Sequence, residues 1–359
     1  MCRFQQSTGR LAVIPFLQKK TTACGLDLGT SWLKMVCLRN AKQGIRLERM
    51  GQMALPFQSK GDSKAIGNAV KTLHASMGFK DKVVISSLRG HEIIVKHMQL
   101  PLAKDMCAVV EKEAREQIPF DLTDLYLDFH VINPAEKKAK KAEVMVVATK
   151  KKVVMNLEAT LELGGLALSM VDVDAFALSN CFEFNYPEQT DPVYLLDIGA
   201  NQGILGIYEP HRPFYFRELG FGGKEITQTL GRQLDIHLNE AEALKRKGPQ
   251  GLPENQRQHA ARAVKDVCRN WCREIQRMEQ FFQTSTTISA MPKKLCISGG
   301  GSLLCGVIPL FAEELEMEVS PLDPWRKILV DSNQSDTQYI KACSSQFVVP
   351  TGLALRGCL

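Results

Sequence analysis

The sequence lacks a long apolar run, since no stretch approaches the roughly 18 apolar residues that a membrane-spanning helix needs. The short run LAVIPFL near the N-terminus contains a proline and no signal-peptide cleavage pattern. Aromatic residues make up only 7% of the chain and are not interleaved with its lysines, which does not favour nucleic-acid binding. We therefore expect a cytoplasmic protein that binds no nucleic acid and meets a membrane only peripherally.

A regular cysteine pattern is also missing, although the chain has 11 cysteines. Their number is odd and they are scattered. Four of them lie inside apolar runs: Cys24, Cys37, Cys296 and Cys305. This is typical of buried free thiols in a reducing cytosol. Cys268 and Cys272 are close in sequence but have no second pair nearby, so a metal site there is not favoured.

The composition describes a soluble globular protein. Of its 359 residues, 45% are apolar and 23% are charged, and the length suggests two domains or a few subdomains. The net charge of +6 includes small lysine groups, among them 137–141 and 150–152. Solvated loops explain such groups, and an acidic partner or an anionic membrane surface is the alternative.

One strand-turn-strand pattern occurs twice. LDLGTSWLKMVCL (26–38) aligns without gaps on LDIGANQGILGIY (196–208). Each copy reads strand, aspartate, apolar residue, glycine, short polar turn and strand. The chain therefore has the pattern of a duplicated fold whose halves begin with the same hairpin.

These hairpins suit phosphate. Gly29 and Gly199 permit a tight turn and close backbone approach, so the following amide groups can bind anionic oxygens. Those amides belong to Thr30, Ser31, Ala200, Asn201 and Gln202. Asp27 and Asp197 would then hold the water shell of a Mg²⁺ that bridges the phosphates. The alternative is that each aspartate only caps its turn.

A third glycine-rich element follows in KKLCISGGGSLLCGVIPLFAEEL (293–315), which reads as a strand, three glycines and a helix opened by Ser302. The glycines are Gly299, Gly300 and Gly301. The sequence has neither GxxxxGK[ST] nor GxGxxG at these elements. The predicted nucleotide site is therefore neither a P-loop nor a Rossmann site.

Two D-x-G hairpins followed by a GGG turn resemble the actin, Hsp70 and sugar-kinase superfamily, in which ATP and Mg²⁺ lie between two lobes. Within it, the chain resembles the PilM family of type IV pilus assembly proteins, which are relatives of FtsA. Four stretches carry this narrower match: EKEAREQIPFDLTDLYLDFHVI (111–132), LGGLALSMVDVDAFAL (163–178), FRELGFGGKEITQTL (216–230) and LNEAEALKRKG (238–248). The resemblance implies an α/β, two-lobed actin-like ATPase fold with an inserted FtsA/PilM-type subdomain.

We assign the alternating strand and helix signals of the sequence to the parts of this fold. The expected parts are an N-terminal segment (1–21), a first lobe (22–85, continued at 171–192 and by a C-terminal helix over 345–359), an inserted subdomain (86–170) and a second lobe (193–344) with a helical subdomain (224–290). In the insert we expect a helix over 104–118 and two strands, 125–132 and 143–150, joined across a lysine-rich turn. Trp271 lies on a helical apolar stripe and is expected to be core.

The resemblance also implies roles for single residues. Glu242 would bind ribose hydroxyls, Lys245 would contact adenine, and Lys34 would neutralise phosphate charge. An exposed helical ion pair and a solvated strand lysine are the alternatives. Asp172 and Asp174 are candidates for a catalytic base, although strand-end aspartates also cap helices.

The implied function is a cytoplasmic ATP-binding scaffold, with at most slow hydrolysis, that belongs to the type IV pilus machinery at the inner membrane. Its expected partners are the N-terminal cytoplasmic tail of PilN and other inner-membrane pilus proteins, and homo-oligomer formation stays open. One alternative is a small-metabolite kinase, which needs a clear base. The other is an FtsA-like division protein, for whose membrane helix VPTGLALRGCL (349–359) is too short.

Overall fold

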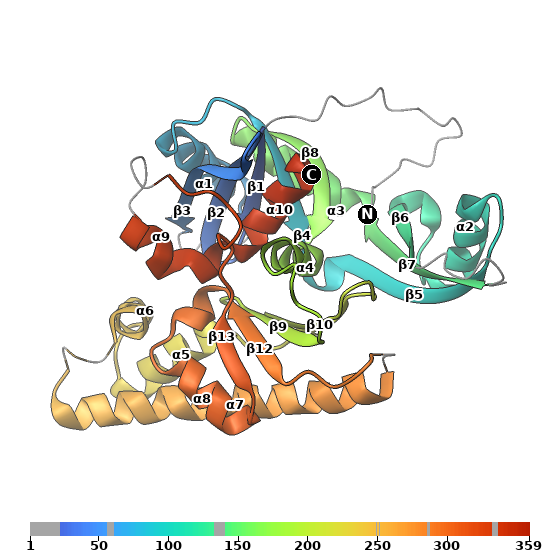
Figure 1. The fold of residues 1–359 in the computed structure, drawn as a ribbon. Coiled ribbons are helices and arrows are strands. Elements are labelled where there is room, and N and C mark those ends of the chain that lie inside the picture. Colours follow the sequence, from blue (N-terminus) through green and yellow to red (C-terminus); the bar gives the residue numbers. More distant parts are fainter. Residues whose placement is uncertain are drawn as a thin grey trace.

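The computed structural model describes residues 22–55, 61–132, 141–248, 250, 252–285, 288–331 and 337–359. The expected N-terminal segment 1–21 and most of the lysine-rich turn lie outside these residues. Figure 1 shows two lobes, one above the other, with a smaller third part beside them. Each of these three parts is built around a sheet of its own.

The first lobe contains a five-stranded sheet in the order β3-β2-β1-β4-β8. Its strands are β1 (Thr22–Leu28), β2 (Trp32–Ala41), β3 (Gly44–Ala54), β4 (Val83–Leu88) and β8 (Ala167–Val173). The helices α1 (Ser63–Ser76) and α3 (Lys151–Leu163) pack on one face, and α4 (Asp174–Asn185) and α10 (Val348–Cys358) pack on the other. Both faces are covered, as the apolar strands β1 and β4 require.

The second lobe repeats this topology with the order β11-β10-β9-β12-β13. Its strands are β9 (Val193–Ile198), β10 (Gly203–Tyr208), β11 (Tyr215–Leu219), β12 (Lys294–Ser298) and β13 (Glu318–Pro321). In both sheets the first strand of the hairpin pairs antiparallel with the second and parallel with a later strand. The duplication predicted from the two D-x-G hairpins is therefore confirmed.

The third part is the insert, a three-stranded antiparallel sheet in the order β5-β7-β6. It comprises β5 (Ile93–Pro101), β6 (Leu125–Ile132), β7 (Lys141–Lys150), the helix α2 (Met106–Gln117) and the short 3-10 turns η1 (Gly90–Glu92) and η2 (Leu122–Asp124). The predicted helix and both predicted strands are confirmed. Since α3 and β8 pack into the first lobe, the insert's sheet occupies less of the range 86–170 than was expected for it.

The helix α10 is held against the first lobe by contacts that only glycine permits. A Cβ on Gly352 would lie 1.8 Å from the carbonyl oxygen of Ala177 in α4. A Cβ on Gly25 in β1 would lie 2.1 Å from the carbonyl oxygen of Pro350. These glycines let the backbones of β1, α10 and α4 approach closely.

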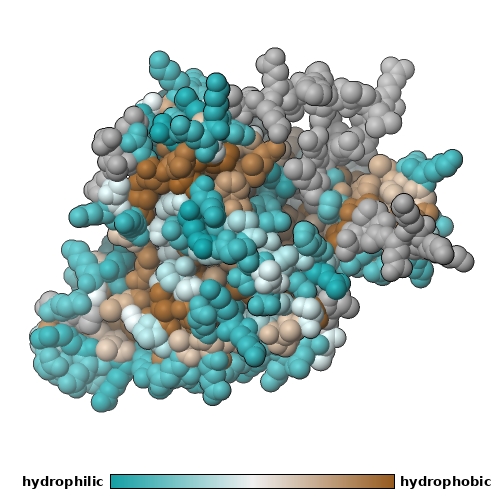
Figure 2. All heavy atoms as spheres, viewed as in Figure 1, coloured by the Kyte–Doolittle hydropathy of each residue, from teal (hydrophilic) through white to brown (hydrophobic). Residues whose placement is uncertain are grey.

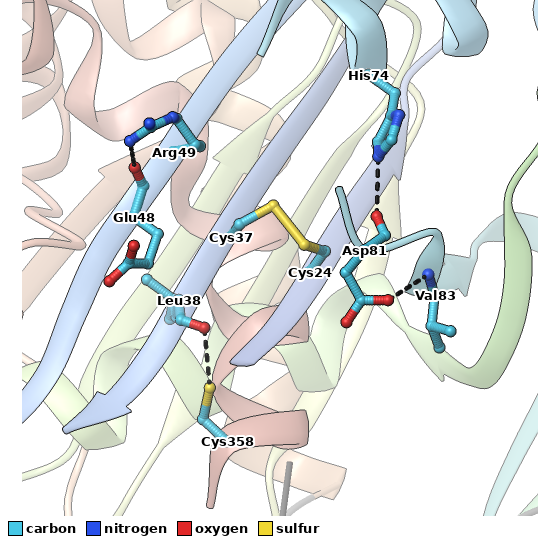
Figure 3. The surroundings of a disulfide bond; sticks show 9 residues. All are labelled: Cys24, Cys37, Leu38, Glu48, Arg49, His74, Asp81, Val83 and Cys358. Carbon is cyan, nitrogen blue, oxygen red and sulfur yellow. Dashed lines mark hydrogen bonds between the residues drawn. A yellow bond between two sulfur atoms is a disulfide. The ribbon is translucent and has the colours of Figure 1, made fainter. Parts of the chain in front are cut away.

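Two cysteines of the first hairpin form a disulfide, which corrects the expectation of free thiols for this pair. Cys24 and Cys37 are opposite one another in the β1–β2 register, with Cα atoms 4.1 Å apart (Figure 3). They are 13 residues apart in sequence, so only the strand register brings them together. Six other cysteines are buried free thiols, as predicted: Cys181, Cys268, Cys272, Cys296, Cys343 and Cys358. Cys305, predicted to be buried, is exposed.

Helices cover the outer face of the second lobe. They are α5 (Gly223–Leu234), α6 (Leu238–Lys247), α7 (Glu254–Ser285) and α8 (Val307–Leu315), while α9 (Thr337–Cys343) packs against the first lobe. The 32-residue α7 runs along the bottom of Figure 1, where Figure 2 shows mostly hydrophilic side chains on its outer side. Trp271 of α7 is 1% exposed and stacks on Phe221, so the predicted core role is confirmed.

The same helix also carries a buried carboxylate, that of Glu279. The Oε1 atom of Glu279 is buried and, within the described part of the chain, has no hydrogen-bond partner. The hydroxyl of Tyr194 in β9 is equally unsatisfied, and the two residues interact electrostatically. Burial raises the pKa of Glu279 from 4.5 to about 7. The ionised form of this side chain therefore costs the folded state free energy.

This burial predicts a pH-dependent stability. Between pH 4.5 and about 7, the folded protein binds more protons at Glu279 than the unfolded chain, so its unfolding free energy falls as pH rises. Because the side chain is partly exposed, we expect Glu279→Gln to raise the unfolding free energy by roughly 1 kcal/mol more at pH 8 than at pH 5. Urea unfolding at both pH values measures this. Glu274→Gln on the same helix is the control, and an equal gain at both pH values would contradict the prediction.

Candidate nucleotide site

The two hairpin turns have the same construction. A Cβ on Gly29 would lie 2.4 Å from the carbonyl oxygen of Trp32, and a Cβ on Gly199 would lie 2.8 Å from that of Gln202. The amide of Gly199 also donates to the Gln202 carbonyl at 3.0 Å. Each glycine is therefore required by the tightness of its own turn.

The aspartates before these glycines belong to one group of charges that spans both lobes. We call it the charged cluster, and its members are Asp27, Lys34, Arg89, Asp174 and Asp197. Asp197 comes from the second lobe and the others from the first. The charges of Asp27 and Arg89 influence the pKa of Asp197, and a Cβ on Gly90, next to Arg89, would lie 4.0 Å from the side-chain amide of Gln202 in the second turn, so the two turns lie on either side of this cluster.

Asp27 is the most strongly paired member. Lys34 Nζ lies 2.8 Å from its Oδ2 atom, and Arg89 Nη2 lies 3.1 Å from its Oδ1 atom. The register explains the first pair, because Asp27 is opposite Lys34 in the β1–β2 hairpin. Burial alone would raise the pKa of Asp27, but the two cations outweigh it and hold this pKa below its ordinary value.

Arg89 was not predicted from the sequence. It follows the last residue of β4 and precedes the insert. Its Nε atom lies 3.3 Å from Asp174, and its Nη2 atom donates to the carbonyl of Leu28 at 2.5 Å. The available signal was an arginine directly after a buried strand, at the sheet edge where Asp27 was already expected to lie.

The structure separates the two candidates for a catalytic base. Asp174 is the first residue of α4, accepts a short hydrogen bond from Ser87 and belongs to the charged cluster. Burial raises its pKa to about 6. Asp172 instead pairs with Arg356 of α10 at 3.2 Å, and its pKa is raised by burial. Only Asp174 is therefore placed beside Asp27 and Asp197.

Asp197 differs from its twin in the first lobe. Ser298 of β12 donates to its Oδ1 atom at 2.8 Å, and no ion pair is recorded for it among the residues that the structure describes. Burial raises the pKa of Asp197, whereas the more distant Lys34 and Arg89 act against this. The same sequence pattern thus places one aspartate in a tight ion-pair network and the other beside a hydroxyl.

The predicted pair on α6 is joined to the second turn. Lys245 Nζ lies 2.6 Å from Glu242 and donates to Thr227 Oγ1 at 3.0 Å and to the carbonyl of Gly223 at 3.1 Å. The amide of Gly223 at the start of α5 donates in turn to Gly199 at 3.0 Å. With its side chain only 12% exposed, Lys245 is not the solvated helical lysine of the alternative.

The GGG element packs against the second turn. A Cβ on Gly299 or on Gly301 would lie 2.5 or 2.2 Å from atoms of Ile198, whereas a Cβ on Gly300 would meet nothing within 4 Å. Gly300 is therefore the glycine whose backbone is open to a ligand. The prediction that Ser302 opens a helix is wrong, because Ser302 lies in the 3-10 turn η4 (Gly300–Leu303) and α8 follows an N-cap at Gly306.

Two contacts connect the lobes close to the charged cluster. The guanidinium of Arg246 on α6 lies 4.8 Å from the ring centre of Trp32, which opens β2. The amide of Gly90 donates to Glu218 of β11 at 2.5 Å. Since Trp32 follows the first turn and Gly90 follows Arg89, both contacts involve segments that carry the predicted phosphate site.

The chemistry of these residues suits phosphate and a hard metal ion. Carboxylate oxygens are the ligands that Mg²⁺ prefers, and Lys34 and Arg89 supply positive charge for phosphate. No group of three or more His, Cys, Asp or Glu side chains in the described ranges is arranged to hold a metal ion. Asp27 and Asp197 would therefore hold such an ion through its water shell, in competition with the cations now paired with Asp27.

Comparison with known proteins decides the family. The family model of the type IV pilus assembly protein PilM matches residues 25–358. The chain belongs to the PilM family. A solved PilM-PilN type IV pilus biogenesis complex contains a chain with 26% identity and a TM-score of 0.82, over 94% of this chain and 98% of that one. The family resemblance predicted from the sequence is confirmed.

More distant structures share the fold. EutJ, an ethanolamine utilization protein from Carboxydothermus hydrogenoformans, is 13% identical with a TM-score of 0.55 over 93% of this chain and 89% of that one. MreB5 of Spiroplasma citri bound to ADP is 11% identical with a TM-score of 0.51 over 93% and 95%. The two-lobed actin-like fold is therefore confirmed, and membership of the PilM family disfavours the kinase and division-protein alternatives.

The contrast between the twin aspartates is testable. Asp27→Ala leaves two largely buried cations without their shared carboxylate and should lower the unfolding free energy by about 3–5 kcal/mol. Asp197→Ala removes one hydrogen bond together with an unfavourable buried charge, so its cost should be about 1 kcal/mol or less. Urea unfolding without Mg²⁺ or nucleotide measures both. An equal loss of unfolding free energy in the two variants would contradict the different surroundings of Asp27 and Asp197.

Proposed function

We propose that this protein is a cytoplasmic scaffold of type IV pilus assembly that binds ATP with Mg²⁺ between its lobes and docks on the cytoplasmic tail of PilN. One observation carries the nucleotide part of the proposal. The two D-x-G turns of a PilM-family chain meet at one charged cluster that contains both aspartates. Duplication of a turn does not by itself require the two copies to lie next to each other in the folded protein.

In this proposal the phosphates lie between the two turns. The amides after Gly29 and Gly199 and the cations Lys34 and Arg89 bind the phosphate oxygens. Asp27 and Asp197 hold the water shell of Mg²⁺, which supplies further positive charge to the phosphates. The nucleoside lies toward Glu242, Lys245 and the open backbone at Gly300, all of which belong to the second lobe.

Hydrolysis is proposed to be slow. Asp174 is the acidic group of α4 that reaches the charged cluster, but Arg89 and Ser87 already bind it. A general base needs a free oxygen within reach of the attacking water or hydroxyl. We therefore expect no phosphoryl transfer to small metabolites at ordinary enzyme rates of about 1 s⁻¹ or more.

Nucleotide binding should stabilise the fold. With Mg²⁺ and with ATP at about 100 times its Kd, the melting temperature should rise by about 3–8 °C, because the ligand binds only the folded state. Asp197→Ala should remove more than half of this shift without unfolding the protein. Glu318→Ala in β13 removes an exposed carboxylate of the same lobe and should keep the full shift. Absence of any shift in the wild type would refute the nucleotide proposal.

Docking on PilN is proposed for the insert, because the similar solved structure is a PilM-PilN complex. Fewer side chains are available there than the apolar strand pattern predicted, because Val144 and Val146 of β7 are buried in the insert's own core. Leu102 and Phe120 remain 41% and 44% exposed, and Lys150 Nζ lies 4.4 Å above the Phe120 ring. Figure 2 shows apolar surface on this part. Apolar anchors beside a cation suit a peptide with apolar and acidic residues.

A binding assay tests this docking site. A labelled peptide of the PilN cytoplasmic tail should bind the wild type, and Phe120→Ala should weaken that binding about 10-fold or more. Leu329→Ala removes another exposed apolar side chain, 41% exposed and next to β3 at the opposite edge of the first lobe's sheet, and should leave binding unchanged. Fluorescence anisotropy gives both affinities. Equal affinities of Phe120→Ala and wild type would place the peptide elsewhere.

The proposed location follows from the partner. No helix in the described ranges is long and apolar enough to cross a membrane. We propose that the protein reaches the inner membrane through PilN and other pilus assembly proteins rather than through a segment of its own. The basic residues at the junction of β7 and α3, Lys150 to Lys152, would then face the acidic groups of a partner.

A further inference from the structure

Arg89 occupies a position that its pairing with Asp27 alone does not explain. One nitrogen, Nε, lies 3.3 Å from Asp174, while another, Nη2, lies 3.1 Å from Asp27 and donates to the Leu28 carbonyl at 2.5 Å. The guanidinium thus lies between two carboxylates with different nitrogens on each. Its side chain is 25% exposed, so part of it is accessible to solvent.

Two cations already pair with Asp27, which leaves this carboxylate no free oxygen for a metal ion. Both oxygens of Asp27 are engaged, one by Lys34 and one by Arg89. Asp27 could hold the water shell of a Mg²⁺ only in competition with these cations, because like charges repel. If Arg89 gave up Asp27, it would keep Asp174, and its Nη2 atom would be available to the anion that accompanies Mg²⁺, the nucleotide phosphate.

We propose that Arg89 is the residue that distinguishes ATP from ADP in this protein, by leaving Asp27 to bind an oxygen of the terminal phosphate. This inference rests on the proposed nucleotide site. Nε keeps its ion pair with Asp174, and Nη2 exchanges Asp27 and the Leu28 carbonyl for the phosphate. A guanidinium can do this because its donors are held in a rigid fork that fits carboxylate and phosphate oxygens equally well.

Lys34 is less suited to this role. It lies directly opposite Asp27 in the hairpin, so its ammonium stays beside the first turn whichever nucleotide is bound. Arg89 reaches the cluster from the end of β4 and is anchored on Asp174 at the far side. Loss of Lys34 should therefore weaken ATP and ADP together, whereas loss of Arg89 should weaken ATP selectively.

Calorimetric titration of ATP and ADP in the presence of Mg²⁺ tests the proposal. The wild type should bind ATP more tightly than ADP. Arg89→Met should weaken ATP binding by about 10- to 100-fold, the size expected for one charge-assisted hydrogen bond, and change ADP binding about 3-fold or less. Arg356→Met removes the matched arginine of the Asp172 pair in the same lobe and should keep the wild-type ratio of ATP to ADP affinity.

Arg89→Lys provides a second variant in case Arg89→Met does not fold. It keeps the charge but loses the fork, so its preference for ATP should fall by about 10-fold or more. An unchanged ratio of ATP to ADP affinity in the folded variant, or equal losses for both nucleotides, would overturn the role of Arg89 and leave the nucleotide site standing. Absence of nucleotide binding by the wild type would refute the nucleotide site itself and Arg89 with it.

Discussion

The ion pairs of Asp27 are the interaction on which the nucleotide site depends. A buried carboxylate is unfavourable unless cations and hydrogen bonds compensate it, and Asp27 meets this requirement with Lys34 and Arg89. Lys34 fixes β2 against β1, and Arg89 ties the end of β4 to both Asp27 and Asp174. One carboxylate therefore aligns three strand ends and the start of α4, which sets the geometry that any phosphate would meet.

The fold could be predicted largely because its signals are local. Asp27 and Gly29 recur at the same spacing as Asp197 and Gly199, so the duplicated hairpin was visible before any contact was known. Arg89 and the Cys24–Cys37 disulfide could not be predicted in this way, because each depends on residues brought together by strand pairing across 62 or 13 positions. The wrong role for Ser302 has a local cause instead, since its hydroxyl donates to the carbonyl of Gly299 within a 3-10 turn and the helix begins only after Gly306.

The insert is connected to both lobes, which bears on how a partner could influence the site. It follows Arg89 directly in the chain, and the amide of Gly90 binds Glu218 of the second lobe. His97 of β5 stacks on Tyr215 of β11 at 4.9 Å, and Tyr215 donates to Glu143 of β7 at 3.3 Å. A ligand that shifts one lobe against the other would alter these contacts. By linkage, any change that the nucleotide makes in the affinity for a partner on the insert is matched by an equal change that the partner makes in nucleotide affinity.

The close packing of α10 against β1 has a consequence for the order in which the two lobes can fold during translation. One face of β1 stays uncovered until α10 (348–358) has left the ribosome, because Gly25 of β1 packs directly on the backbone of Pro350. The sheet of the second lobe, from Val193 to Pro321, is complete in the chain before that point. The later half of the duplicated protein can therefore fold first, while the nascent first lobe still exposes apolar strands that chaperones recognise.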